Sequence, residues 1–182
     1  MKKYLNILIV LLFLFLAGCM GFGSKDDQVV LIVRGTEFTL GDVRFLYGDD
    51  NIQDGITLLK YMELTRQEVE DLNLDTSESF EFNNQFIKEL PPKNEASESE
   101  LQDWAFAESQ AKKFKMDPQE YFLEYVERDM YYLSYFETYV HEFLGEPDSD
   151  NEAEMEAYNI EVNELLNELE AKHKDEIKIL YK

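Results

Sequence analysis

Residues 117–144 read DPQEYFLEYVERDMYYLSYFETYVHEFL and predict one long helix. Asp117 suits the N-cap, Pro118 the first helical position and Glu120 the third, which makes this the clearest helix start in the chain. The helix can continue to Leu144, because the first break in Gly and Pro comes at residues 145–151. A helix of this length is roughly 40 Å long.

Two apolar stripes lie side by side on this helix. The first has i, i+3 and i+4 spacing and is expected to face the core; it comprises Phe122, Val126, Met130, Leu133, Phe136, Val140 and Phe143. The second is rotated by about 100° and consists of tyrosines: Tyr121, Tyr125, Tyr132, Tyr135 and Tyr139. Tyrosine tolerates half-burial and binds apolar or amide surface with little loss of entropy. We expect part of this row, with Phe136 and Trp104, to line a groove that binds polypeptide. The alternative is that the rings pack against neighbouring helices.

Strand signals stand near both ends of the chain, and we expect them to pair. Residues 28–39 (QVVLIVRGTEFT) indicate two strands joined by a turn at Arg34 and Gly35. Residues 176–181 (EIKILY) alternate as in a half-buried strand. Neither signal would form a stable sheet alone, so their pairing would close the domain and bring the C-terminus back to the N-terminal end.

Further helices are expected between and after these strands. Two of them begin at capping boxes, one made by Thr39 with Asp42 and one by Ser97 with Glu100. The expected helices cover residues 41–47, 51–73, 77–90, a segment from 97 onward, and 152–173. The predicted fold is therefore mostly α, with a small β element formed by N-terminal strands and a C-terminal strand.

Four segments together resemble the peptide-binding domain of SurA-like chaperones and PrsA-type foldase lipoproteins. They are VVLIVRGTEFTLGDV (29–43), ITLLKYMELTRQEVEDLNLD (56–75), AFAESQAKKFKMDPQEYFLEY (105–125), and the last helix with EIKILYK (176–182). The resemblance implies a helical SurA-N-like chaperone domain over residues 28–182.

One part of the PrsA-type pattern is missing. That family has a parvulin prolyl isomerase domain between the long helix and the closing helix, where this chain has only residues 145–151. A parvulin pocket is rich in histidine, whereas this chain has His141 and His173, both expected on helix surfaces. The resemblance therefore implies the chaperone part without the isomerase, and we expect no enzymatic activity.

The N-terminus predicts a lipid anchor. Lys2 and Lys3 precede an apolar run over residues 4–16, a layout typical of a signal peptide and too short for a stable membrane span. Leu16, Ala17, Gly18 and Cys19 then resemble the lipobox of bacterial lipoproteins. We expect residues 1–18 to be removed, Cys19 to carry the lipid and residues 19–27 to form the anchor and tether, which places the protein on the extracytoplasmic face of the cell membrane. The alternative is an ordinary secretory signal with an incidental cysteine.

Composition narrows the range of partners. The chain has 39 acidic and 17 basic residues, a net charge of −22, which repels nucleic acid and anionic lipid headgroups. Aromatic residues make up 14% of the chain, which argues against disorder. Cys19 is the one cysteine, so no intramolecular disulfide forms. The sequence has no phosphate-binding loop and no zinc ligand set, and residues 148–152 do not have the EF-hand pattern, so we expect no cofactor and no metal.

These patterns favour one function and leave a second open. The first is a membrane-anchored, non-catalytic, chaperone-like lipoprotein that binds unfolded or extended exported polypeptides in an apolar groove. The second is an interaction lipoprotein that docks one specific folded partner of the cell envelope.

Overall fold

The computed structural model describes residues 25–147 and 151–182. Within these ranges the chain forms six α-helices and one three-stranded antiparallel sheet, which confirms the predicted fold class. The predicted signal peptide and the lipobox at residues 16–19 lie outside the described residues. Among the described helices, none combines the length and the apolar character needed to cross a membrane.

The sheet joins the two ends of the described chain. Strand β1 (Val29–Val33) lies between β2 (Thr36–Thr39) and β3 (Ile177–Ile179), so the predicted pairing of the terminal strands is confirmed. The β1–β2 turn consists of Arg34 and Gly35, and both have positive φ, 47° and 91°, as a two-residue hairpin requires. This backbone is costly for a non-glycine residue. The Arg34 guanidinium forms ion pairs with Glu68 and Asp71 of α3.

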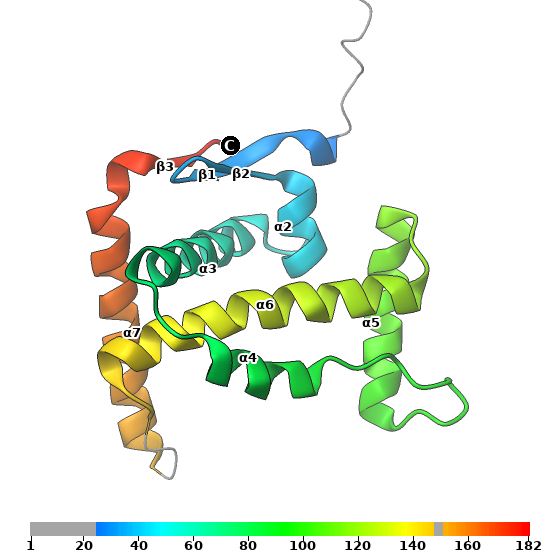
Figure 1. Ribbon diagram of the computed structural model, residues 1–182. Helices are drawn as coiled ribbons and strands as arrows, with labels where there is room; N and C mark the ends of the chain where they lie inside the picture. The colour runs from blue at the N-terminus through cyan, green and yellow to red at the C-terminus, as the bar shows by residue number, and fades with distance from the viewer. Residues whose placement is uncertain (1–24, 148–150) are drawn as a thin grey trace, which may run out of the picture.

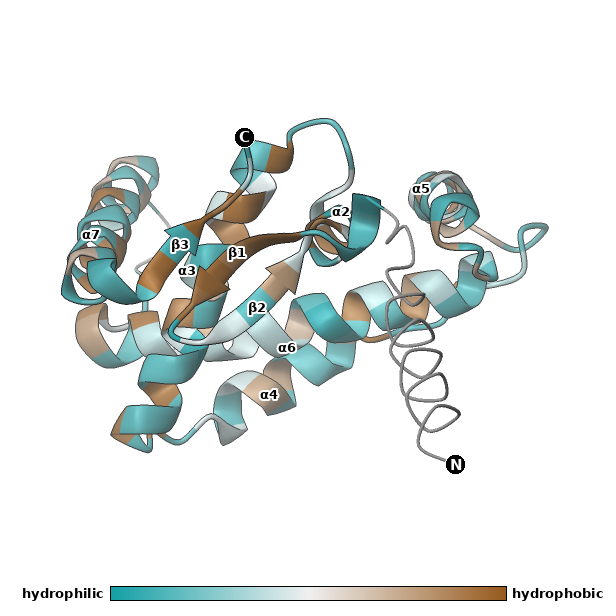
Figure 2. Cartoon of the chain, turned by 90° about the horizontal axis from the view of Figure 1, so that it is seen from above, coloured by the Kyte–Doolittle hydropathy of each residue, from teal (hydrophilic) through white to brown (hydrophobic). Residues whose placement is uncertain are grey.

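The helices lie below the sheet in successive layers (Figure 1). Helices α2 (Leu40–Tyr47) and α3 (Ile52–Leu72) pack under the sheet, and the long α6 (Pro118–Leu144) crosses beneath them. The short α4 (Ser77–Asn83) lies on the other side of α6. The remaining two helices, α5 (Glu98–Phe114) and α7 (Glu152–Lys172), contact α6 near its N-terminal and C-terminal ends. Seen from above, apolar β1 lies over α3 (Figure 2).

Side-chain caps set the helix ends where the sequence predicted them. Both capping boxes are present, at the start of α2 and at the start of α5. The Asp117 side chain accepts hydrogen bonds from the backbone N–H groups of Gln119 and Glu120. Helix α6 therefore begins at Pro118 and ends at Leu144, as predicted.

Helix α4 is shorter than the predicted helix over residues 77–90. The Asn83 side chain is buried, and its amide donates to Ser134 Oγ (3.1 Å) and Glu137 Oε2 (2.7 Å) of α6. A 3-10 turn, Asn84–Phe86, follows, and the chain then runs to Leu90, which is buried in the core. This docking of Asn83 and Leu90 ends the helix before its apolar pattern does.

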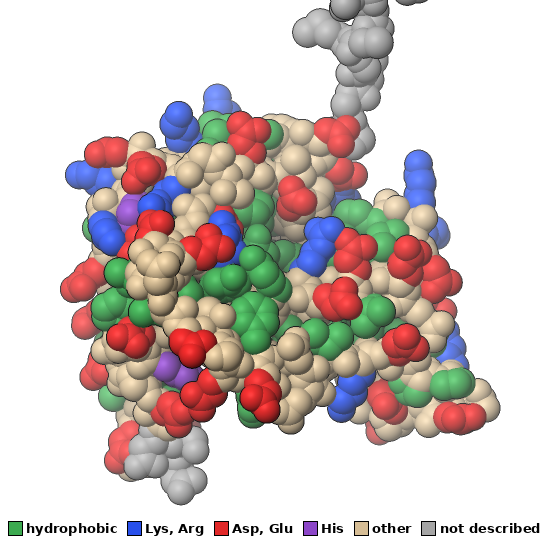
Figure 3. Space-filling model, in the orientation of Figure 1, with side chains coloured by type: hydrophobic (Ala, Val, Ile, Leu, Met, Phe, Trp, Pro, Cys, Tyr) green, Lys and Arg blue, Asp and Glu red, His purple; other side chains and the backbone are tan. Residues whose placement is uncertain are grey.

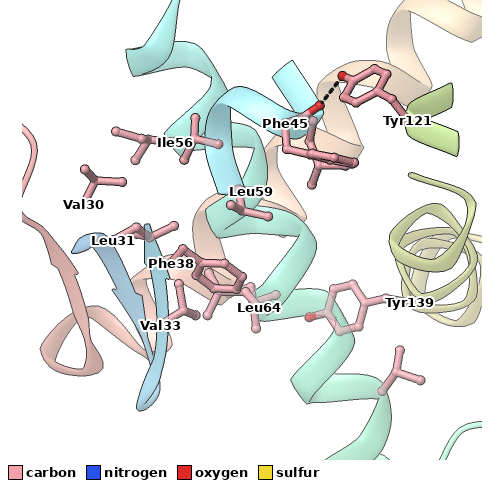
Figure 4. Packing of buried hydrophobic residues seen from close by; sticks show 14 of the residues in the cluster. Val30, Leu31, Val33, Phe38, Phe45, Ile56, Leu59, Leu64, Tyr121 and Tyr139 are labelled. Atoms are coloured by element: carbon pink, nitrogen blue, oxygen red, sulfur yellow. Dashed lines mark hydrogen bonds between the residues drawn. The ribbon is translucent and has the colours of Figure 1, made fainter. Parts of the chain in front are cut away.

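The core lies between the sheet and α6, with α3 in the middle (Figure 4). Its labelled members come from the sheet, α2, α3 and α6: Val30, Leu31, Val33, Phe38, Phe45, Ile56, Leu59, Leu64, Tyr121 and Tyr139. Helices α2 and α3 approach closely at Gly55, where a Cβ atom would stand 2.9 Å from Val43 Cγ1. Glycine at position 55 therefore allows α2 and α3 to pack in the same layer.

Helix α3 also buries charged side chains, because the sheet, α6 and α7 cover it from different sides. Lys60, Glu63 and Glu68 are each less than 5% exposed, and each has an oppositely charged partner. Lys60 pairs with Glu170 of α7, and Glu63 pairs with Arg66 one turn along α3. Arg66 therefore neutralises a buried carboxylate.

His173 is buried, and the expectation that it lies on a helix surface is wrong. It is 6% exposed; its Nε2 lies 2.7 Å from Glu68 Oε1, and its Nδ1 lies 3.0 Å from Glu176 Oε1. Glu68 also pairs with Arg34 and Lys172. One carboxylate on α3 therefore binds the hairpin turn and the end of α7, directly before the chain enters β3.

We predict that Glu68→Gln destabilises the fold by about 2–4 kcal/mol, because the cations around it lose their shared carboxylate in a buried place. Chemical denaturation followed by circular dichroism measures the change. The control is Glu70→Gln on the same helix, which removes only the exposed pair with Arg66 and should cost about 0.5 kcal/mol. Equal effects of the two variants would contradict the role given to Glu68.

Acidification should weaken the same contact. Burial of Glu68 alone would raise its pKa, but hydrogen bonds from Lys172 and His173 outweigh burial and hold the pKa below its ordinary value. A carboxyl whose pKa is lower in the folded chain stabilises the fold above its unfolded pKa, about 4.3 for Glu. This stabilisation is lost as the pH falls through the folded pKa. The free energy of unfolding should therefore fall more steeply below about pH 5 in the wild type than in Glu68→Gln; parallel profiles would contradict this.

Candidate functional site

The tyrosine row of α6 faces the interior of the protein. Tyr121 is fully buried, and its hydroxyl donates a hydrogen bond of 2.7 Å to the carbonyl oxygen of Phe45 (Figure 4). Tyr139 is 5% exposed. The prediction that these two tyrosines line an open groove is wrong, because α6 packs on α2 and α3 with this face and the two rings fill the core. Tyr125, Tyr132 and Tyr135, between them, are half-buried.

The stripe that was predicted to face the core is, apart from one residue, the less buried of the two. Val140 is buried, and Phe143 is 50% exposed. The other members are half-buried: Phe122, Val126, Met130, Leu133 and Phe136. The tyrosine row therefore enters the core at Tyr121 and Tyr139, whereas the first stripe enters it only at Val140.

Trp104 belongs to a different part of the surface. Its indole Nε1 donates to the carbonyl oxygen of Pro91 (2.8 Å), and the Lys93 ammonium lies 5.1 Å from the centre of its ring. Trp104 therefore holds the loop between α4 and α5. The aromatic residues of α5 that contact the tyrosine row are Phe106, whose ring centre is 5.1 Å from that of Tyr125, and Phe114, whose ring stacks on Tyr121 at 5.9 Å.

A cleft of about 370 Å³ opens beside the middle of α6. We call it the aromatic cleft. It is lined by Phe38, Asp42, Leu46, Leu59, Glu127, Arg128, Tyr131 and Tyr132. Its floor consists of buried apolar residues of β2, α2 and α3, and its α6 wall consists of two adjacent tyrosines. Figure 3 shows hydrophobic side chains gathered in the middle of the face where α6 passes α3, with acidic side chains around them.

Of the residues that line this cleft, only Tyr132 belongs to the predicted groove, and Tyr131 is the exposed aromatic residue that the prediction left out. It is 40% exposed, and its ring centre lies 5.5 Å from that of Tyr132 and 5.1 Å from that of Tyr135. Phe80 of α4 packs against it from the other side, at 6.0 Å. Tyr131 lies about 100° from Tyr132 around the helix, away from the row, so the stripe pattern left it out. The adjacent tyrosines at positions 131 and 132 were the sequence feature that could have identified Tyr131.

The walls of the aromatic cleft are neutral, and its rim is charged. Burial raises the pKa of Tyr132 to about 12, so its hydroxyl stays protonated and able to donate a hydrogen bond. Asp42 at the rim already accepts hydrogen bonds from the Thr39 N–H and hydroxyl. Arg128 pairs with Glu124, and its guanidinium carbon lies 4.5 Å from the centre of the Phe45 ring. Asp42 and Arg128 are therefore engaged within the protein, whereas Glu127, which also lines the cleft, is exposed and forms no ion pair with another described residue. The interior of the cleft is free for apolar groups.

The size of the aromatic cleft suits the binding of apolar side chains. A volume of 370 Å³ lies near the lower end of ligand-pocket sizes and accommodates one or two apolar side chains. In residues 25–147 and 151–182, no group of three or more His, Cys, Asp or Glu side chains is placed to hold a metal ion. The other histidine, His141, is exposed on α6 and lies away from the aromatic cleft.

Comparisons of the chain with protein-family models, with curated protein sequences and with solved structures gave no match.

A mutation at Tyr121 should lower the stability of the fold without changing binding in the aromatic cleft. Tyr121→Phe removes a buried hydrogen bond and leaves the Phe45 carbonyl without this donor, so we expect a loss of about 1–2 kcal/mol in the free energy of unfolding. Peptide binding should not change. The control is Tyr125→Phe, whose hydroxyl forms no hydrogen bond to another described residue, and it should change stability by about 0.5 kcal/mol at most. Thermal denaturation of both variants makes the comparison; a Tyr121→Phe protein as stable as the wild type would contradict the structural role of Tyr121.

Proposed function

We propose that this protein is a membrane-anchored, non-catalytic, chaperone-like lipoprotein that binds unfolded or extended exported polypeptides in the aromatic cleft beside α6. The observation that supports this most directly is the cleft itself. It combines an apolar floor with an exposed tyrosine, Tyr131, on a helix whose other tyrosines are buried or half-buried. An exposed aromatic ring beside an apolar hollow is the usual form of an anchor point for an incoming side chain.

The size of the cleft predicts weak and sequence-tolerant binding. Full burial of one Leu or Phe side chain contributes about 1.5–3 kcal/mol, and ordering an extended chain opposes part of that gain. A single cleft therefore retains a client only briefly. Short retention suits a chaperone, because the client must be released in order to fold.

The N-terminal features complete the proposal. A lipid on Cys19, with residues 16–18 as the recognition sequence for cleavage, would hold the domain at the membrane where exported chains emerge. The resemblance to SurA-like and PrsA-type proteins supports the same function. A net charge of −22 would keep the protein soluble while clients are bound to it.

The test is suppression of aggregation by the full chain held in nanodiscs of zwitterionic lipid. Several unrelated unfolded proteins serve as clients. We expect the wild type to suppress aggregation at a few-fold molar excess, and Tyr131→Ala with Tyr132→Ala to weaken client binding by about fivefold or more, since truncating an aromatic anchor typically costs over 1 kcal/mol.

The matched control is Phe143→Ala. Phe143 is also an exposed aromatic residue of α6, and it does not line the aromatic cleft. It should leave suppression unchanged. A wild type that fails to protect any client would overturn the proposed function. Recovery of one stoichiometric folded partner, without protection of unfolded clients, would favour the docking lipoprotein.

A further inference from the structure

A second and larger cleft lies between α4 and the C-terminal part of α6. Its volume is about 770 Å³. We call it the acidic cleft, because six of its twelve lining residues are carboxylates: Asp75, Glu78, Glu81, Glu137, Glu142 and Glu146. None of these lining residues is Lys or Arg, although the protein places Lys or Arg beside its buried carboxylates elsewhere.

No described Lys or Arg lines the acidic cleft beside its carboxylates. Hydrogen bonds from the Ser77 hydroxyl and backbone N–H hold the pKa of Asp75 below its ordinary value. Glu137 accepts a hydrogen bond from the neutral amide of Asn83. Glu78, Glu81 and Glu142 have exposed side chains, and no ion pair within residues 25–147 and 151–182 involves them. A cleft with this lining attracts cationic groups.

The acidic cleft also has an apolar component. Phe82 lines it and is 55% exposed, and its ring centre lies 5.3 Å from that of Phe86, which is 51% exposed. Exposed aromatic faces bind the guanidinium of arginine and the ammonium of lysine, as well as the aliphatic stems of these side chains. Carboxylates with adjacent aromatic rings therefore suit Lys and Arg side chains better than a bare metal ion.

The two clefts are neighbours on α6. Tyr131 and Tyr132 line the aromatic cleft, and His141 and Glu142 line the acidic cleft. The two pairs are ten residues apart, which corresponds to about 15 Å along the helix axis and a rotation of about 80° around it, so 15 Å is the shortest separation between them. Between them lies Phe80, which packs on Tyr131 and whose chain neighbours line the acidic cleft. An extended polypeptide covers 15 Å in about four or five residues.

We infer that the clients bound through the aromatic cleft are basic segments, in which Lys or Arg residues stand about four or five residues from an apolar residue. The apolar side chain occupies the aromatic cleft, and the basic side chains occupy the acidic cleft. This inference rests on the proposed function and adds the class of polypeptide to it. A second copy of this chain is a poor occupant, because two molecules of net charge −22 repel each other.

The experiment uses fluorescence anisotropy with the full chain in zwitterionic nanodiscs and three labelled twelve-residue peptides. The first has one Phe and, four residues away, a Lys-Lys-Arg cluster. The second has Gln in place of the three basic residues, and the third has Glu. We expect the first to bind about tenfold more tightly than the second at low salt, the third to bind most weakly, and the difference to shrink as salt is raised.

Two triple variants test whether the preference for the basic peptide comes from the acidic cleft. Glu78→Gln, Glu81→Gln and Glu142→Gln together neutralise the exposed carboxylates of the acidic cleft. Glu156→Gln, Glu161→Gln and Glu164→Gln together change the net charge equally on the exposed surface of α7. The first triple variant should lose most of the preference for the basic peptide, about fivefold or more, and the second should retain it.

The outcomes distinguish a failure of this inference from a failure of the proposed function. Equal binding of basic and neutral peptides by the wild type would overturn the role of the acidic cleft and leave the aromatic cleft standing. Equal losses in the two triple variants would also overturn it, because the attraction would then come from overall charge. If the wild type binds none of the peptides and protects no unfolded client, the proposed function fails, and this inference fails with it.

Discussion

Helix α6 is held against the core at two points, and the aromatic cleft exists because of that constraint. Tyr121 and Tyr139 are eighteen residues apart, which is five helical turns, so both project from the same side of the helix. Both are buried, and Tyr121 is also hydrogen-bonded to the backbone of α2. Between these points α6 spans the edge of the layer formed by β2, α2 and α3 without sealing it. The aromatic cleft is the part of that junction that remains open.

The same constraint sets the flexibility expected of the site. The floor of the aromatic cleft belongs to the core, where Leu59 is fully buried and Phe38 is 7% exposed, so it is rigid. One wall is the exposed Tyr131 ring, which contacts Phe80 of the short helix α4. Helix α4 is tied to α6 by Asn83 and by the Ser79–Thr138 hydroxyl contact. A buried apolar floor beside an exposed aromatic ring suits a surface that accepts different apolar side chains.

Local signals predicted the elements well, and long-range packing decided the site. The Thr39–Asp42 and Ser97–Glu100 caps and the bounds of α6 follow from hydrogen bonds within a few residues, so they are readable from sequence. The position of α3 decides which stripe of α6 faces the core. The two stripes are adjacent and similarly apolar, so the sequence of α6 alone does not show which of them α3 will cover. The burial of His173 depends on Glu68, 105 residues away, and no local pattern reveals such a partner. Tyr131 can be recognised as a site residue only from the fold, because residues of β2, α2 and α3 form the other side of the cleft.

Fluorine NMR of the full chain tests the central claim most directly, with 3-fluorotyrosine at all eleven tyrosine positions and single Tyr→Phe variants to assign the resonances. Addition of an unfolded client should shift or broaden the resonances of Tyr131 and Tyr132, because their rings line the aromatic cleft. Those of Tyr121 and Tyr139 should stay in place, because their rings are sealed in the core. A client that binds while the Tyr131 and Tyr132 resonances remain unchanged would contradict the assignment of the binding site to this cleft.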